Sequence, residues 1–357
     1  MKIAVLGAGN GGMAMAAHMV IKGHNVSLYD KFANTLVGIQ KERGIHFKGA
    51  VGEGFAPISI VSDDIEEVIK DRELIMVVTP AFAHISIAEA LAPAVEQSQM
   101  IILHPGRTGG ALEVRNVIKG KRSDLSPIVA EAQTLLYASR RTGESEVTIY
   151  GIKQRVAFSS LPAKFNAVLG EKLQSIFPQF YPVTNIWETS LMNIGAIFHP
   201  TPSILNCARI EDTKGDFEYY HQGITPTLGK VLERIDQERV NVAKAFGIKT
   251  LTTVEWLKDV YGAEGKDIYT AVHANKVYSG IKAPGDIKAR YISEDVPMSL
   301  VPISELGRLA GVETPTIDMI INLADIMHDK DYRKEGRNLD AMGIRGMSTE
   351  DLKQIVS

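Results

Sequence analysis

The sequence predicts an α/β fold, with a doubly wound, mostly parallel sheet in a first domain over residues 1–187 and a mainly helical second domain over 188–357. Short apolar segments alternate with helical patterns up to about residue 187, which is typical of a parallel sheet covered by helices on both faces. Beyond that point strand-like segments become rare and long helical patterns dominate. At 357 residues and 45% hydrophobic content, the chain is long enough for two cores.

The first domain is expected to consist of short buried strands separated by helices. Expected strands lie at residues 2–6, 25–29, 57–61, 73–78, 99–103, 127–131, 156–160 and 180–183, and expected helices at 11–21, 33–43, 83–91, 111–119 and 164–176. In the second domain we expect helices at 188–198, 225–246, 301–309 and 315–327 and a largely loop-like stretch at 261–291.

A glycine-rich turn directly follows the first strand and opens the first helix. The first glycine, Gly7, permits a tight strand-to-helix turn, Gly9 lets the backbone approach a pyrophosphate, and Gly12 lets the helix pack closely on the sheet. The amino-terminal N–H groups of that helix would then point at phosphates. A merely tight turn is the simpler alternative, but a strand before it and a helix after it favour a dinucleotide-binding (Rossmann) fold. The full turn reads Gly7-Ala8-Gly9-Asn10-Gly11-Gly12.

An acidic residue, Asp30, closes the second expected strand, 18 residues beyond Gly12. A carboxylate at this place can accept hydrogen bonds from both adenosine ribose hydroxyls, and it would repel a 2′-phosphate. The adjacent Lys31 could soften that repulsion. The sequence therefore favours NAD as the cofactor and leaves NADP as the alternative.

Further polar and turn residues follow three of the expected strands. Thr79 and Pro80 follow the strand at 73–78, and Gly106 follows the next one. Because open parallel sheets bind ligands at the carboxyl ends of their strands, these residues are expected to line the cofactor site. Gln133 and Thr134 could position a substrate carboxylate or the carboxamide. The alternative is that the residues after these strands only form ordinary turns and loops.

Composition excludes several classes of function. The net charge is −3 and no long basic block occurs, which argues against nucleic acid and anionic membrane surfaces as partners. Cys207 is the only cysteine, so neither a disulfide framework nor a thiolate metal site is expected, and no metal is assigned. No apolar segment is long enough to span a bilayer, and a cytoplasmic location is the expectation.

The candidate acid/base group is His199, which follows the expected helix at 188–198. Pro200 disfavours helical geometry at the residue before it, so the helix is expected to end at His199. The negative potential at a helix carboxyl end would raise the affinity of the imidazole for a proton. Such a group suits the reduction of a carbonyl or an imine, because hydride addition leaves oxygen or nitrogen in need of a proton. A histidine that only caps carbonyl groups is the alternative.

A charged segment far along the chain supplies candidate partners for this histidine. Asp295 could accept the other imidazole N–H, and Arg290 could bind a substrate carboxylate in a bidentate fork. Alternatively, the segment is an exposed loop in which Arg290 pairs with Glu294 or Asp295. Spacing in the sequence does not separate these two interpretations.

Taken together, these segments resemble the opine dehydrogenases, a family that includes octopine dehydrogenase and bacterial N-(carboxyethyl) amino acid dehydrogenases. The resemblance implies a nucleotide-binding domain joined to an all-helical domain, with substrate held in the cleft between them. It also implies reductive condensation of an α-keto acid, such as pyruvate, with the amine of an amino acid, using NAD(P)H. Under it, His199 is the acid/base group, Asp295 its carboxylate partner and Arg290 a carboxylate binder, while Asn193 is a candidate substrate contact. The matching segments are Gly7 to Gly12, Pro80 to His84, Pro105 to Ala111, Glu131 to Tyr137, Asn193 to Pro200, Arg290 to Pro297, and Thr314 with Pro315.

One departure and two alternatives accompany the resemblance. Met298 and Ser299 stand where many relatives carry an aromatic residue and then glycine, so the pocket for the amine substrate could differ. A ketopantoate or 3-hydroxyacid reductase would share the two-domain plan, but such enzymes generally place a lysine one turn before the helix asparagine, where this chain has Thr189. A non-catalytic NAD(H)-sensing protein is the other alternative. The sequence leaves the oligomeric state open, and a homodimer is the candidate because helical second domains in such folds often pair.

Overall fold

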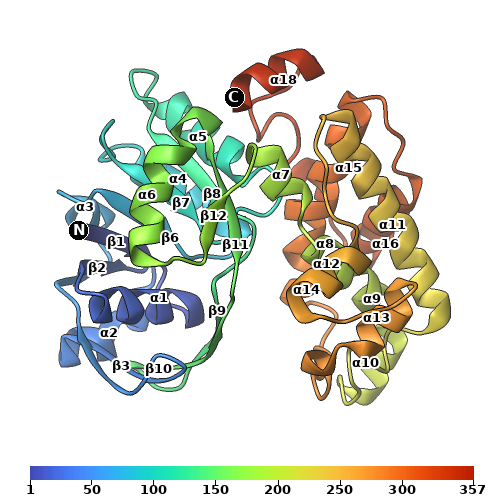
Figure 1. Cartoon of the computed structure of the whole chain (residues 1–357), viewed down its shortest axis with the longest axis horizontal. Coiled ribbons are helices and arrows are strands. Elements are labelled where there is room, and N and C mark those ends of the chain that lie inside the picture. Colours follow the sequence, from blue (N-terminus) through green and yellow to red (C-terminus); the bar gives the residue numbers. More distant parts are fainter. The chain divides into compact units, whose positions relative to one another are not determined.

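The computed structural model covers residues 1–357, and contacts within the chain divide it into two units (Figure 1). The first unit is Met1–Thr189 with Ile355–Ser357, and the second is Ser190–Gln354. This division lies two residues beyond the expected boundary at 187/188. The last three residues belong to the first unit, contrary to the expected range 188–357, because the chain end returns to it: the Lys164 N–H donates to the carbonyl of Ser357 at 3.0 Å.

An eight-stranded sheet forms the centre of the first unit, in the order β12-β11-β8-β7-β6-β1-β2-β5. Every neighbouring pair is parallel except β8 and β11, so the expected mostly parallel sheet is confirmed. The strands are apolar and buried because both faces are covered by helices. Their bounds are β1 (Lys2–Leu6), β2 (Asn25–Tyr29), β5 (Ile60–Ser62), β6 (Leu74–Val77), β7 (Met100–Leu103), β8 (Ile128–Ala132), β11 (Val156–Leu161) and β12 (Phe180–Pro182).

Helices cover both faces of this sheet, as a doubly wound fold requires. α1 and α6 contribute to one apolar core with the central strands, whereas α3, α4 and α5 pack in series with one another. All of these helices except the short α3 lie close to helices that the sequence predicts. Their bounds are α1 (Asn10–Ile21), α2 (Ala33–Glu42), α3 (Ile65–Ile69), α4 (His84–Leu91), α5 (Gly110–Lys121) and α6 (Asn166–Ile176).

A second sheet of four strands, in the order β4-β3-β10-β9, was not predicted. The strand expected at 57–61 exists but begins later than predicted: Pro57 ends β4 of the small sheet, and β5 of the large sheet begins at Ile60. Several of these strands are half exposed and carry few apolar residues, so they lack the apolar signal of the central strands. Helix α1 contacts both sheets. The strands are β3 (Gly44–Gly49), β4 (Gly54–Pro57), β9 (Tyr137–Arg141) and β10 (Glu146–Ile152).

The second unit is mainly helical, as expected. The expected helix at 188–198 is interrupted, because α7 ends at Leu191 and α8 begins only at Gly195. The expectation of loop at 261–291 is wrong at α13, which begins with a capping box formed by Asp267 and Thr270. α7 begins in the first unit and α18 ends in it. The helix bounds from residue 186 onward are α7 (Ile186–Leu191), α8 (Gly195–Phe198), α9 (Pro200–Leu205), α10 (Cys207–Thr213), α11 (Pro226–Ala245), α12 (Thr253–Tyr261), α13 (Ile268–Ala274), α14 (Arg290–Ser293), α15 (Val301–Leu309), α16 (Pro315–His328), α17 (Tyr332–Glu335) and α18 (Thr349–Val356).

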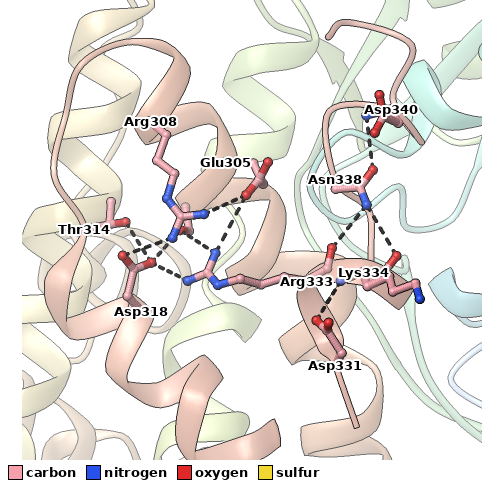
Figure 2. A network of polar contacts seen from close by, with 10 residues as sticks. Glu305, Arg308, Thr314, Asp318, Asp331, Arg333, Lys334, Asn338 and Asp340 are labelled. Carbon is pink, nitrogen blue, oxygen red and sulfur yellow. Dashed lines mark hydrogen bonds and ion pairs between the residues drawn. The ribbon is translucent and has the colours of Figure 1, made fainter.

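A polar network ties α15, α16 and α17 together around Asp318 (Figure 2). Its Oδ1 accepts hydrogen bonds from Ser304 Oγ at 2.5 Å and Arg333 Nη2 at 2.6 Å, and its Oδ2 lies 3.4 Å from Arg308 Nη2. Burial opposes ionisation of this carboxyl, but the hydrogen bonds and cations outweigh it and hold the pKa of Asp318 below its ordinary value. No helix anywhere in the chain combines the length and the apolar character needed to cross a bilayer.

Candidate active site

The glycine-rich turn between β1 and α1 is shaped by two close backbone approaches. Gly7 has φ of +110°, and a Cβ there would lie 2.6 Å from the carbonyl oxygen of Val78. A Cβ on Gly12 would lie 1.6 Å from the carbonyl oxygen of Gly7, so only glycine fits. Gly9 differs, because a Cβ there would meet nothing within 4 Å. The backbone at Gly9 therefore faces open space, where a bound group can approach.

The surroundings of this turn fit the phosphates and ribose of a dinucleotide. Helix α1 has no side-chain cap and no acidic residue in its first turn, so its free N–H groups suit an anion. The hydroxyl oxygen of Thr79, just beyond β6, is buried and makes no hydrogen bond. Asp30 follows β2; its Oδ2 accepts from Ala8 N at 2.8 Å and its Oδ1 from Phe32 N at 3.0 Å. These bonds fix the carboxylate at the end of the strand.

Arg141 supports the turn from the end of β9, and sequence reasoning missed it. Its guanidinium donates to the carbonyl oxygens of Ala8 at 3.2 Å, Thr35 at 3.0 Å and Gly143 at 3.0 Å. Its backbone N–H donates to Asn10 Oδ1 at 2.9 Å. The side chain of Asn10 is therefore turned toward β9. No local pattern could reveal this arrangement, because Arg141 lies more than a hundred residues from the turn.

The loop after β7 is held by a buried carboxylate, Glu131 of β8. Its Oε2 accepts from Ala111 N at 3.0 Å, near the start of α5, and its Oε1 accepts from Thr189 Oγ1 at 2.7 Å. A Cβ on Gly106 would lie 2.4 Å from Glu131 Cβ, so glycine is required for this close approach.

The remaining residues proposed for this end of the sheet lie at its strand ends. Pro80 forms the cap of the short 3-10 helix at Ala81–Ala83. Gln133 and Thr134 are half buried immediately beyond β8.

In the second unit, His199 and Asp295 meet although they are 96 residues apart. His199 Nδ1 lies 2.8 Å from Asp295 Oδ2. The Asp295 side chain is 1% exposed, and that of His199 is 22% exposed. No other protein group bonds to the imidazole Nε2, so this nitrogen is free to act on a ligand.

α8 ends at Phe198 with His199 as its carboxyl-terminal cap, as predicted, but a further helix was not expected to follow at once. The residue has φ of −95° and ψ of −61°, and α9 begins directly at Pro200, where proline is tolerated because the first helical N–H needs no partner. His199 therefore lies between the carboxyl end of α8 and the amino end of α9. The two end potentials oppose one another, and Asp295 supplies the counter-charge instead.

The imidazole is held in place by neighbouring aromatic and hydroxyl groups. The ring of Tyr291 stacks on His199 with a centroid distance of 4.4 Å and an interplanar angle of 6°. The backbone carbonyl of His199 accepts hydrogen bonds from Tyr219 Oη at 2.6 Å and Ser203 Oγ at 2.7 Å. The stacked tyrosine covers one face of the imidazole ring, and the hydrogen bonds to the carbonyl fix the backbone that carries it.

Arg290 lies next to Tyr291 at the start of α14. Its Nε is 2.7 Å from Oε2 of the buried Glu294, so the ion pair weighed from the sequence is present. The Arg290 side chain is nevertheless 61% exposed, and its two terminal nitrogens take no part in this ion pair. The guanidinium is thus anchored at Nε and open at its end. Asn193 is buried, and its Nδ2 donates to Ser299 Oγ at 2.8 Å.

Comparison with known proteins identifies the family. Residues 182–328 match the α-helical domain of NAD/NADP octopine/nopaline dehydrogenases, and residues 2–121 match the amino-terminal domain of NAD-dependent glycerol-3-phosphate dehydrogenase. The opine dehydrogenase of Arthrobacter sp. (strain 1C) is 39% identical over 353 residues, which cover 99% of this chain and 98% of that protein. The chain belongs to the opine dehydrogenase family. It is therefore an NAD(P)-dependent oxidoreductase acting on CH–NH substrates.

Solved structures share the fold of this opine dehydrogenase family member. Octopine dehydrogenase in complex with NADH and agmatine superposes with a TM-score of 0.83 at 21% identity, covering 99% of this chain and 97% of that one. Yersinopine dehydrogenase gives 0.80 at 14% identity, covering 100% and 97%. A ketopantoate reductase from Ralstonia eutropha JMP134 gives a lower TM-score of 0.66 at 16% identity, covering 92% and 99%.

Proposed function

We propose that the enzyme condenses an α-keto acid, such as pyruvate, with the amine of an amino acid and reduces the product to an N-carboxyalkyl amino acid. The observation that supports this most directly is the bond between His199 and Asp295, which joins an acid/base group to a buried carboxylate. Octopine dehydrogenase, which shares the fold, has been solved with NADH and pyruvate and with NADH and L-arginine.

His199 serves as the proton donor in this proposal. Condensation of the keto group with the amine releases water and leaves a C=N bond. When bound, NAD(P)H would supply the hydride that the carbon of this bond takes up. His199 Nε2 would donate the proton that the nitrogen needs. Asp295 holds Nδ1–H, so that Nε2 is the nitrogen presented to substrate, and it balances the charge of the imidazolium. In the oxidative direction the same imidazole accepts the proton.

Arg290 binds a substrate carboxylate in this proposal. Its two terminal N–H groups can form a bidentate pair with a carboxylate, while Glu294 holds Nε. Gln133 and Thr134 are proposed to contact substrate or the carboxamide. Asn193 is a further proposed substrate contact, and its amide also donates one hydrogen bond to Ser299 Oγ.

NAD is the proposed preferred cofactor, with Asp30 as the selecting residue. Since its two oxygens each accept one backbone N–H, the carboxylate is fixed and its remaining lone pairs are available to ribose hydroxyls. We expect Asp30→Ala to narrow the preference for NAD over NADP by about 10-fold, measured as the ratio of kcat/KM values. Asp63→Ala, which removes an exposed carboxylate after β5, is the control. An unchanged ratio in Asp30→Ala would contradict the assignment.

The reaction is tested by following NADH oxidation with a matrix of keto acids and amino acids. The proposal expects turnover only when both substrates are present. Reduction of a keto acid alone would instead indicate a hydroxyacid or ketopantoate type of reductase. Absence of turnover across the whole matrix in well-folded protein would indicate an NAD(H)-sensing role.

The cellular setting is also proposed. We place the enzyme in the cytoplasm, in keeping with a single free cysteine, Cys207, and a reducing compartment. We expect a homodimer, which sedimentation velocity of the purified protein tests directly.

A further inference from the structure

Asp295 has a second buried partner on the oxygen that does not face His199. Ser299 Oγ donates to Asp295 Oδ1 at 3.1 Å, and Asn193 Nδ2 donates to Ser299 Oγ at 2.8 Å. Ser299 is 0% exposed, Asp295 1% and Asn193 3%. If one of these groups were removed, water could not reach its neighbour to replace the lost hydrogen bond.

The chemistry of Asn193, Ser299 and Asp295 sets the direction of each hydrogen bond between them. The amide nitrogen of Asn193 can only donate, so Ser299 Oγ is the acceptor there. The single hydroxyl hydrogen of Ser299 is then left for Asp295, whose ionised carboxylate can only accept. With Oδ1 occupied in this way, Oδ2 is turned to Nδ1–H of His199.

The backbone that carries Ser299 is unusual and well supported. Residues Val296–Leu300 form a π-helical turn, a conformation found frequently at functional sites. The carbonyl of Pro297 within this turn accepts the N–H of Arg337 at 3.0 Å. A Cβ on Gly336 would lie 2.8 Å from the same oxygen, so the two segments are in close contact. The turn is thereby held in the one position from which Ser299 reaches Asp295.

We propose that Ser299 and Asn193 are positioning residues of the acid/base pair, and that together they fix the orientation of Asp295 and the tautomer of His199. This inference rests on the proposed role of His199. Ser299 is fully buried and acts through Asp295. Asn193 fixes the direction in which the Ser299 hydroxyl donates.

Two variants and one control test this inference. Ser299→Ala removes the donor to Asp295, and we expect kcat to fall about 10-fold while the KM for NADH stays unchanged. Asn193→Asp replaces the donor by an acceptor that competes for the Ser299 hydroxyl, so a similar fall is expected, with little further loss in the double variant. The control is Ser304→Ala, because Ser304 is also 0% exposed and also donates to a carboxylate, that of Asp318.

A readout independent of turnover separates this inference from the proposed function. In ¹⁵N NMR spectra of the whole protein, we expect the Nδ1–H tautomer of His199 to predominate in wild type and in Ser304→Ala and to lose population in Ser299→Ala. Ser299→Thr, which keeps the hydroxyl, should restore both the tautomer and kcat. An unchanged tautomer and kcat in Ser299→Ala would overturn the inference. A wild-type protein without condensation activity would overturn the proposed function and leave the tautomer result standing.

Discussion

The nucleotide-binding turn of the first unit and the acid/base pair of the second are built in opposite ways. The turn depends on missing side chains: Gly7 and Gly12 each bring backbone within a distance that a Cβ would not allow. The pair depends on side chains that are present: the imidazole of His199 and the carboxylate of Asp295 form a hydrogen bond although the two residues are 96 positions apart. One site is therefore sensitive to added atoms, and the other to removed ones.

The largest effect is expected where an atom is added to the tightest part of the turn. Gly12→Ala would place a Cβ 1.6 Å from the carbonyl oxygen of Gly7, so the turn or helix α1 must move. We expect a loss of ~3 kcal/mol or more in the free energy of unfolding, measured by denaturant unfolding. We also expect no measurable NADH binding in a fluorescence titration.

The matched control for this change lies three residues away. Gly9→Ala adds the same methyl group where nothing lies within 4 Å. We expect normal stability but weaker NADH binding, because the methyl group occupies the space over the turn. Equal stability of the two variants would show that backbone contact does not shape the turn.

The next largest effect is expected where a side chain is removed from the acid/base pair. His199→Ala should lower kcat about 10³-fold, because general acid catalysis by a positioned group is lost, and should leave NADH binding unchanged. His221→Gln is a suitable control, since His221 also lies near a carboxylate, with 3.4 Å between its Nδ1 and Glu218 Oε2. Normal turnover in His199→Ala would remove its proposed role.

The same difference explains which parts could be predicted from sequence. The turn is contiguous, so the roles of Gly7 and Gly12 follow from local spacing, and the buried strands follow from short apolar segments. The small sheet was missed because its strands, such as Tyr137–Arg141, are half exposed and polar. The end of α8 at His199 was predicted correctly, but α9 was missed because Pro200 can begin a helix as well as end one.

Long-range partners set the limit of local prediction. The sequence offered Asp295 as a candidate partner of His199, but only the family resemblance favoured this over an exposed loop. The contacts of Ser299 with Asp295 and Asn193 were not foreseen at all. The departure at Met298 and Ser299 pointed toward the amine pocket, whereas the Ser299 side chain faces Asp295. A hydrogen bond between residues distant in sequence leaves no periodic signal in the chain.

A moderate effect is expected where the turn does depend on a side chain. Arg141→Ala removes the guanidinium that donates to the carbonyls of Ala8 and Thr35. We expect the KM for NADH to rise about 10-fold with kcat unchanged, because a loosened turn binds the cofactor less well but leaves the chemistry intact. Arg140→Ala, its exposed neighbour on β9, should behave as wild type. If the two variants have the same KM, Arg141 does not support the turn.

The smallest change in activity or stability at neutral pH is expected at a histidine that is part of the packed core and has no proposed catalytic role. His18 of α1 lies with its Nδ1 3.1 Å from Tyr137 Oη and its ring 5.1 Å from that of Phe177. Burial, with a smaller contribution from Lys22, lowers the pKa of His18 from 6.5 to about 4. Between these two values the unfolded chain binds a proton that the folded chain does not. Stability should therefore fall as the pH drops from about 6.5 toward 4.

His18→Gln removes this titration and tests its size. Between pH 7 and 4.5 we expect the free energy of unfolding to fall by ~2 kcal/mol more in wild type than in the variant, measured by urea unfolding. This figure allows for residual hydration of the imidazole. His221→Gln, in the second unit, should follow wild type. Parallel curves of unfolding free energy against pH for wild type and His18→Gln would mean that His18 binds a proton as readily in the folded as in the unfolded protein. The contrast between a packing histidine in one unit and a reacting histidine in the other would then fail.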